Sequence, residues 1–198
     1  METKIFGNVK NPSVLIIGVF HGDEPQGNYL IRKYLEINPN TNLLMLPCLN
    51  ESGFKAGTRV NKNKVDLNRN FPTQNWVLGT RNEFYGGDFP GSEPETRFLI
   101  STIEKYLPKV IITLHAPYKV VNFDGGKSGE GLELAKKISD IIKYPVEEDI
   151  GYSTPGSFGT WAGVEKDIPT ITLELDDKID IKELEYPVFK IFKMFENY

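Results

Sequence analysis

Four short apolar runs, rich in β-branched residues, alternate along the chain with segments of helical periodicity. Runs of this length and composition are typical of strands that are buried on both faces of a sheet. We therefore predict strands at residues 14–20, 43–46, 110–114 and 170–175. Apolar residues recur at every third or fourth position in other segments. This spacing predicts helices at residues 26–36, 94–107, 130–143 and 183–196.

The alternation of strands and helices predicts an α/β sandwich, in which a largely parallel sheet is covered by helices on both sides. Ligands of such sheets bind at the carboxyl ends of the strands. One long segment, residues 50–92, is rich in Gly, Asn, Arg and Pro and has little periodicity. Irregular segments of this length are usually functional. The chain contains no repeat and no linker, so residues 1–198 are predicted to form a single domain.

Composition and charge exclude several classes of protein. The formal net charge is −4 and the basic residues are scattered, which argues against nucleic-acid binding, because that depends on clustered Lys and Arg. No stretch of about eighteen apolar residues is present, so no membrane span is predicted. The N-terminus lacks the pattern of an export signal, and we expect a cytoplasmic protein. Cys48 is the only cysteine, so an internal disulfide is excluded.

The two histidines of the chain each follow a predicted strand directly, His21 after residues 14–20 and His115 after residues 110–114. Either histidine alone is more simply explained as a polar residue at a sheet edge. Glu24 follows His21 by three residues, a spacing at which a turn directs the imidazole and the carboxylate to one point. Two histidines and one glutamate form the ligand set of many catalytic zinc sites. We therefore predict one zinc ion, held by His21, Glu24 and His115.

Glu174 lies within the predicted strand 170–175, whose apolar residues mark it as central. An ionised carboxylate in such a strand is costly without a partner. A glutamate at the end of the strand could simply face solvent. We favour a catalytic carboxylate, acting as the general base for water that the zinc ion acidifies.

Six segments, in the same order along the chain, resemble the zinc metallocarboxypeptidase family and, within it, the small bacterial murein peptide amidases. The resemblance extends from His21 to Glu174, and the ordered set is far more specific than any one segment. It implies a three-layer α/β/α sandwich with a mixed, largely parallel central sheet. The segments are 18–25 (GVFHGDEP), 65–72 (VDLNRNFP), 91–96 (GSEPET), 114–115 (LH), 154–157 (TPGS) and 173–174 (LE).

The resemblance also implies roles for residues whose own patterns suggest only turns or loops. Asn68 and Arg69 match residues that hold the terminal carboxylate of the substrate, an anion that suits a guanidinium. Asp66 matches the carboxylate that orients the first metal histidine. Arg59 resembles the arginine that polarises the scissile carbonyl and stabilises its oxyanion. Tyr152 stands near the position of a mobile tyrosine that closes over the substrate.

The reaction implied by the resemblance is zinc-dependent hydrolysis of a C-terminal amide in a small peptide with a free terminal carboxylate. Glu174 would activate the attacking water and then protonate the leaving amine, while Arg59 would stabilise the oxyanion. For the amidase subgroup the implied substrate is a murein peptide. The bond cut would join the γ-carboxyl of D-glutamate to meso-diaminopimelate, as in cell-wall recycling.

Two other hypotheses stay open for the sequence alone. Aspartoacylases and succinylglutamate desuccinylases share the His-x-x-Glu motif and the distant histidine, and they remove acyl groups from amino acids. Residues 66–72 and 91–96 favour the peptidase. A zinc- or peptide-binding module without catalysis is the other hypothesis, although metal binding alone does not need Glu174. The sequence predicts neither the oligomeric state nor the side-chain preference.

Overall fold

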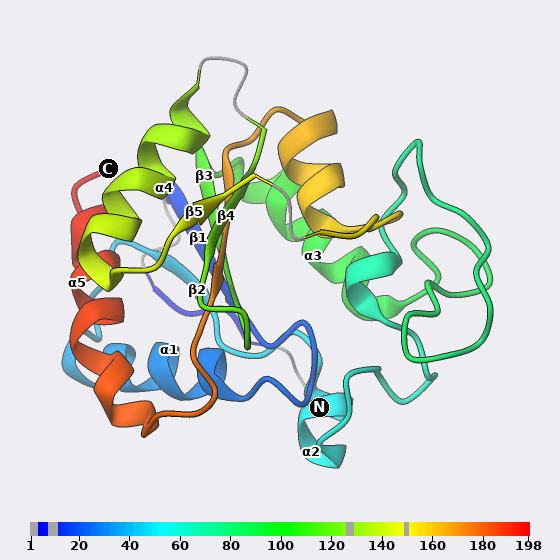
Figure 1. Cartoon of the computed structure of the whole chain (residues 1–198), viewed down its shortest axis with the longest axis horizontal. Coiled ribbons are helices and arrows are strands. Elements are labelled where there is room, and N and C mark those ends of the chain that lie inside the picture. Colours follow the sequence, from blue (N-terminus) through cyan, green and yellow to red (C-terminus); the bar gives the residue numbers. More distant parts are fainter. Residues whose placement is uncertain (1–3, 8–11, 126–128, 149–150) are drawn as a thin grey trace.

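A six-stranded sheet runs through the middle of the molecule (Figure 1). The computed structural model describes residues 4–7, 12–125, 129–148 and 151–198. The strand order is β2-β1-β3-β6-β4-β5. All pairs are parallel except β4 with β6, so the sheet is mixed and largely parallel, as predicted. The strands are β1 (Val14–Gly18), β2 (Leu44–Leu46), β3 (Val110–His115), β4 (Val121–Asp124), β5 (Val146–Glu147) and β6 (Thr170–Glu174).

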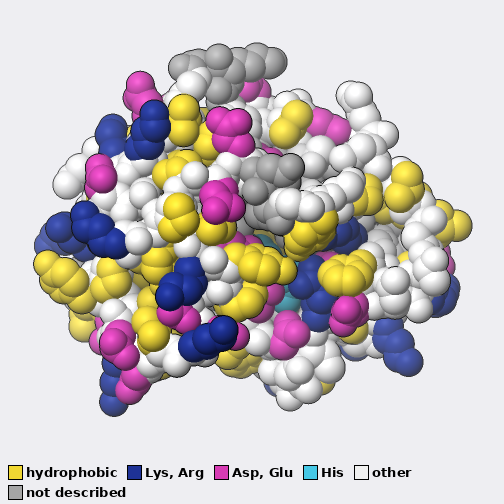
Figure 2. All heavy atoms as spheres, viewed as in Figure 1, with side chains coloured by type: hydrophobic (Ala, Val, Ile, Leu, Met, Phe, Trp, Pro, Cys, Tyr) yellow, Lys and Arg dark blue, Asp and Glu magenta, His cyan; other side chains and the backbone are white. Residues whose placement is uncertain are grey.

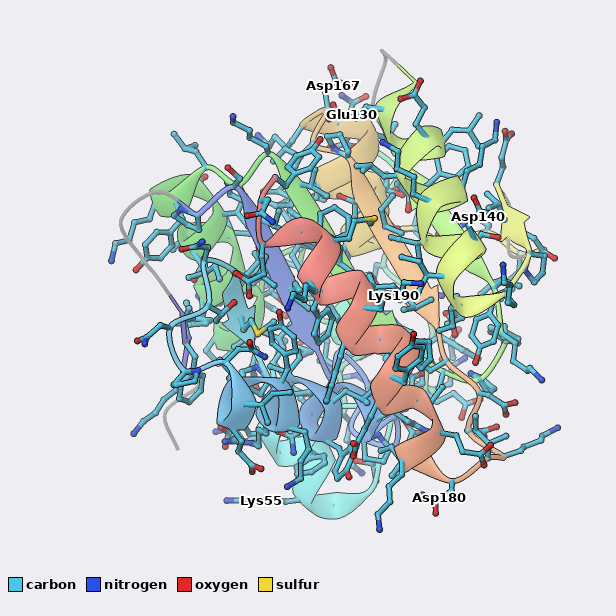
Figure 3. The ribbon with its side chains drawn as sticks, turned by 90° about the vertical axis from the view of Figure 1, so that its left-hand side faces the viewer. Lys55, Glu130, Asp140, Asp167, Asp180 and Lys190 are labelled. Atoms are coloured by element: carbon cyan, nitrogen blue, oxygen red, sulfur yellow. The ribbon has the colours of Figure 1, made fainter. Side chains whose placement is uncertain are left out.

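Helices cover both faces of the sheet, which confirms the predicted α/β/α sandwich. Helices α1, α4 and α5 lie on one face, and α3 lies on the other (Figure 1). Figure 3 shows α5 in front of the sheet, with α1 and α4 to either side. The helices are α1 (Gln26–Ile37), α2 (Glu51–Ala56), α3 (Pro94–Tyr106), α4 (Glu130–Ile142) and α5 (Glu185–Phe195), with shorter helical turns at Leu67–Arg69, Thr160–Glu165 and Ile181–Leu184.

Alternate residues of the central strands face the two helical layers. In β1, Val14 and Ile16 belong to the core beneath α1, α4 and α5, whereas Leu15 and Ile17 belong to the core beneath α3. All four side chains are essentially inaccessible to solvent. A sheet that is buried on both faces presents its functional polar groups mainly at the strand ends.

The described residues depart from the prediction in several places, among them strand β5 and helix α2, neither of which was predicted. The first strand ends at Gly18 rather than at residue 20, because Val19 has a φ of 54°, which an extended strand does not allow. The segment 118–131, whose path the sequence did not predict, contains the antiparallel strand β4.

No helix in the described ranges is long and apolar enough to cross a membrane. Residues 1–3 of the N-terminal segment lie outside those ranges.

Candidate active site

Three neighbouring strands end at the same edge of the sheet and carry the predicted site. Strand β3 pairs in parallel with β1 and β6, which places Gly18 beside Leu114 and His115 beside Glu174. His115 and Glu174 are therefore adjacent through sheet register alone. His21 follows the end of β1, and its ring centroid lies 4.9 Å from that of His115. The fold thus brings together two histidines that are far apart in the sequence.

Glu24 joins the two histidines. Its backbone N–H donates to the carbonyl of His21 at 3.2 Å, which closes a tight turn. One carboxylate oxygen of Glu24 lies 2.7 Å from His21 Nδ1, and the other lies 2.9 Å from His115 Nδ1. Candidate ligand atoms from the three residues lie within 4.8 Å of one another. Histidine atoms are visible near the centre of the face shown in Figure 2, among charged side chains.

Asp66 lies beside His21, where the resemblance placed it. The carboxylate of Asp66 is fully buried, and its Oδ1 is 3.2 Å from His21 Nε2, so that Nδ1 faces Glu24. Burial by itself lowers the pKa of His21, but the carboxylates of Asp66 and Glu24 outweigh burial and raise the pKa to about 9. Burial raises the pKa of Glu24, but His115 and His21 outweigh burial and lower it to about 2. The pocket therefore favours positive charge between its carboxylates.

The three residues fit a zinc ion. Two imidazole nitrogens and one carboxylate form a donor set found in catalytic zinc sites. His21 turns its other ring nitrogen to the carboxylate of Asp66, the contact that fixes the tautomer of many zinc-bound histidines. Next to this group, the buried Oε2 of Glu174 has no hydrogen-bond partner among the described residues. An unpaired buried oxygen at this position leaves an acceptor for a water molecule or a substrate group.

Glu174 has the environment of a proton acceptor. Its side chain is buried, and its backbone N–H donates to the carbonyl of Val120 at 3.0 Å. Burial raises the pKa of Glu174 above its usual range, although the charge of His115 partly opposes this. A carboxylate with a raised pKa accepts a proton more readily.

Arg59 borders the metal group, as predicted. Its Nε and Nη2 donate to Asp66 Oδ2 at 3.0 and 2.8 Å, while Nη1 lies 3.4 Å from His21 Nδ1. The backbone of Arg59 is held by the buried amide of Asn50, which donates to the carbonyls of Phe20 and Arg59 at 3.2 and 3.1 Å. This role of Asn50 could not be predicted from the sequence, because an asparagine before a short helix indicates only a helix cap.

Asn68 and Arg69 lie on a short helical turn and both line the cleft. Asp66 caps this turn, since its Oδ1 accepts from the backbone N–H of Asn68 at 2.8 Å. Asn68 Oδ1 accepts from the backbone N–H of Phe158 at 2.8 Å, and Arg69 Nη1 donates to the carbonyl of Asn68 at 2.7 Å. Hydrogen bonds therefore hold both side chains in place in the cleft that also contains the metal group.

Tyr152 lies at the rim of the cleft, with 44% of its surface exposed. The neighbouring Tyr118, another exposed residue that lines the cleft, has its pKa raised chiefly by interaction with Tyr152. A role for Tyr152 in covering the substrate stays a prediction. The sequence analysis did not identify Tyr118, because the path of segment 118–131 was not predicted.

The cleft has a volume of about 710 Å³ and includes an acidic part that the sequence analysis missed. Asp124, the last residue of β4, lines it. Its carboxylate has no hydrogen bond or ion pair within the described part of the chain, and burial raises its pKa to about 6. A Cβ at Gly159 would lie 2.1 Å from Asp124 Oδ2, and one at Gly163 would lie 2.4 Å from Asp124 Cβ. No motif marks Asp124, because its place depends on an antiparallel strand without a clear pattern.

The sequence matches the profile of the zinc carboxypeptidase family over residues 4–189. The chain therefore belongs to this family, which confirms the predicted family of zinc peptidases. His21, Glu24 and His115 form its candidate zinc-binding group.

Two murein peptide amidases are among its relatives. Murein peptide amidase A from Vibrio campbellii is 37% identical over 179 residues, which cover 83% of this chain and 70% of that protein. The protein of the same name from Escherichia coli K12 is 32% identical over 163 residues, which cover 75% of this chain and 65% of that protein. The crystal structure of murein-tripeptide amidase from Escherichia coli O157 superposes with a TM-score of 0.80 at 29% identity, covering 96% of this chain and 83% of that one. The chain thus spans roughly two thirds of the two curated relatives.

Proposed function

We propose that the protein is a hydrolase with one zinc ion per chain, which cleaves the C-terminal amide bond of a small murein peptide. The bond cut joins the γ-carboxyl of D-glutamate to meso-diaminopimelate. The observation that carries this proposal is the convergence of His21, Glu24 and His115 beside Glu174, whose buried Oε2 has no hydrogen-bond partner among the described residues. The names of the amidase relatives support the choice of substrate. A cytoplasmic location, where free murein peptides are recycled, is part of the proposal.

Each residue around the metal group has a task in this reaction. Zinc, when bound, supplies a Lewis acid that polarises a carbonyl and acidifies water. Glu174 takes the proton from the attacking water and returns it to the leaving amine nitrogen. Arg59 directs Nη1 toward the developing oxyanion while Asp66 holds its other edge.

The cleft also offers contacts for the two ends of the departing residue. Asn68 and Arg69 bind its terminal carboxylate, with Arg69 providing the positive charge. Asp124 provides a negative charge in the same cleft, without an ion-pair partner among the residues that the structure describes. A departing residue that ends in a cation matches this arrangement, and the side chain of meso-diaminopimelate carries an ammonium group. Tyr152 covers the bound peptide at the rim.

A substrate panel tests the proposal. We expect cleavage of the γ-D-glutamyl-meso-diaminopimelate tripeptide, loss of activity with a zinc chelator, and recovery when zinc is restored. Replacing the last residue of the peptide with alanine removes the whole distal part of diaminopimelate, its ammonium group included, and should slow cleavage by at least roughly 10- to 100-fold, the value of one charged hydrogen bond. Initial rates of cleavage, measured by chromatography, are compared across the panel. Faster cleavage of N-acyl amino acids than of every peptide would reassign the protein to the deacylases.

Replacing Asp124 with asparagine should stabilise the free protein at neutral pH. The pKa of this carboxyl is raised to about 6 in the fold from a usual value of 3.8, so the folded state binds its proton more tightly than the unfolded state does. Its ionisation therefore destabilises the fold as the pH rises through about 6. We expect D124N to gain roughly 1–3 kcal/mol of unfolding free energy at pH 8 and little at pH 4.

Urea unfolding of both proteins at the two pH values measures this difference. The same variant should cleave the diaminopimelate peptide more slowly, because it lacks the negative charge that faces the ammonium group. A gain in stability with a loss of activity is typical of a residue that is kept for binding. Equal stability at pH 4 and pH 8, together with unchanged cleavage, would remove Asp124 from the site.

A further inference from the structure

Asp66 holds the Arg59 guanidinium but does not fix the orientation of its plane. Its two hydrogen bonds to Asp66, from Nε and Nη2, go to a single oxygen, Oδ2. A fork that binds two oxygens fixes the plane of a guanidinium, whereas two bonds that meet at one oxygen allow that plane to pivot. The third corner, Nη1, faces the metal group, 3.4 Å from His21 Nδ1 and 4.0 Å from Glu24 Oε1. Without another restraint, this attraction would pull the guanidinium toward the metal group.

Phe84 supplies a second contact. The Cζ atom of Arg59 lies 5.1 Å from the centroid of the Phe84 ring, within the range of a cation–π interaction. Phe84 also lines the cleft together with Arg59. The ring thus restrains the cation through its face, while Asp66 holds one edge.

The backbone around Phe84 is attached to the same aspartate. The N–H of Asp66 donates to the carbonyl of Tyr85 at 2.8 Å. The N–H of Phe84 donates to Asn82 Oδ1 at 2.8 Å, which closes a turn at this point of the long irregular segment. The contacts therefore form a ring that runs from Asp66 to Arg59, on to Phe84, and back to Asp66 through Tyr85.

Phe84 makes little contribution to the core. Its side chain is 47% exposed, and it also lines a second hollow of about 290 Å³ next to the cleft. Because the ring is half exposed and borders two hollows, it buries little apolar surface. Its loss should therefore leave the fold intact.

We propose that Phe84 is a positioning residue, which keeps Arg59 turned toward the scissile carbonyl and away from Glu24. This inference rests on the proposed function, because the position of Arg59 matters only if the site hydrolyses an amide. Phe84 acts through Arg59 on the transition state, so its effect belongs to kcat rather than to KM.

Kinetics of variants at this position test the proposal. We expect F84A and F84L to lower kcat by roughly 2- to 30-fold, the range of a cation–π contact, with KM within about twofold of the original. F84W should restore kcat, because it restores the aromatic face. F89A is the matched control, since Phe89 is an exposed phenylalanine of the same segment that lines neither hollow. Unchanged kcat in F84A, or full activity in F84L, overturns the proposal.

A double-mutant cycle and a chemical probe separate this idea from simple damage to the loop. In an R59K background, F84A should change kcat by less than about twofold, because the planar guanidinium that Phe84 contacts is already absent. An equal loss in both backgrounds overturns the proposal. Phenylglyoxal should modify Arg59 faster in F84A than in the original protein, as read by peptide mapping. Equal labelling also overturns it, even if no peptide of the panel is cleaved and the proposed function itself fails.

Discussion

Replacing Glu174 with glutamine should lower the rate of peptide hydrolysis by roughly 10²- to 10⁴-fold, the usual contribution of a general base. The zinc content should stay at about one ion per chain, because the metal group needs only three protein ligands. Glutamine keeps the size of the side chain but cannot accept the proton. The pKa of the native Glu174 carboxylate is raised by burial, which suits that carboxylate to accepting a proton. Initial rates and metal analysis of E174Q measure both quantities.

The control is E104Q, in which the altered glutamate is exposed on α3 outside the cleft. It should keep both activity and zinc. If E174Q lost zinc and activity to the same degree, Glu174 would have a structural role instead of a catalytic one.

Removing His115 should abolish activity together with metal binding. We expect H115A to bind zinc at least about 100-fold more weakly, because even the loss of groups that only orient zinc ligands costs 10- to 100-fold. His115 also stacks on Phe20, with ring centroids 5.3 Å apart, so H115Q serves as a second variant that retains more of the side chain. Titration with a coloured chelator gives the affinities.

D23N is the matched control for metal binding. Asp23 is exposed and immediately precedes Glu24, but it is not part of the three-residue group. Its variant should therefore keep zinc at the original affinity. Wild-type affinity in H115A and H115Q would mean that the ion is held elsewhere.

The fold could be predicted because its strands are short and apolar and its helices are periodic. The site could be predicted because its central residues directly follow those strands, as His115 does, or end one of them, as Glu174 does. Parallel strands place such residues at one edge whatever the intervening loops do. The family motifs then identified Asp66 and Arg59, which no periodic pattern marks.

The remaining residues could not be predicted, because their positions come from tertiary contacts. Strand β4 has only four residues, so Asp124 gave no signal of its own. Phe84 lies in an irregular segment, and its contact with Arg59 depends on a hydrogen bond between Asp66 and Tyr85. Pairs this far apart in sequence become neighbours only after the chain has folded.

The pairing of His115 with Glu174 across β3 and β6 separates the chemistry of this enzyme from its choice of substrate. The spacing between His115 and Glu174 is set by main-chain hydrogen bonds in the centre of the sheet, including the one from Leu175 N–H to the carbonyl of His115 at 2.7 Å. Many of the other residues that line the cleft, such as Arg59, Phe84 and Tyr152, come from loops. Loop grafting or directed evolution could therefore redirect such a scaffold to new peptides without disturbing its reactive centre.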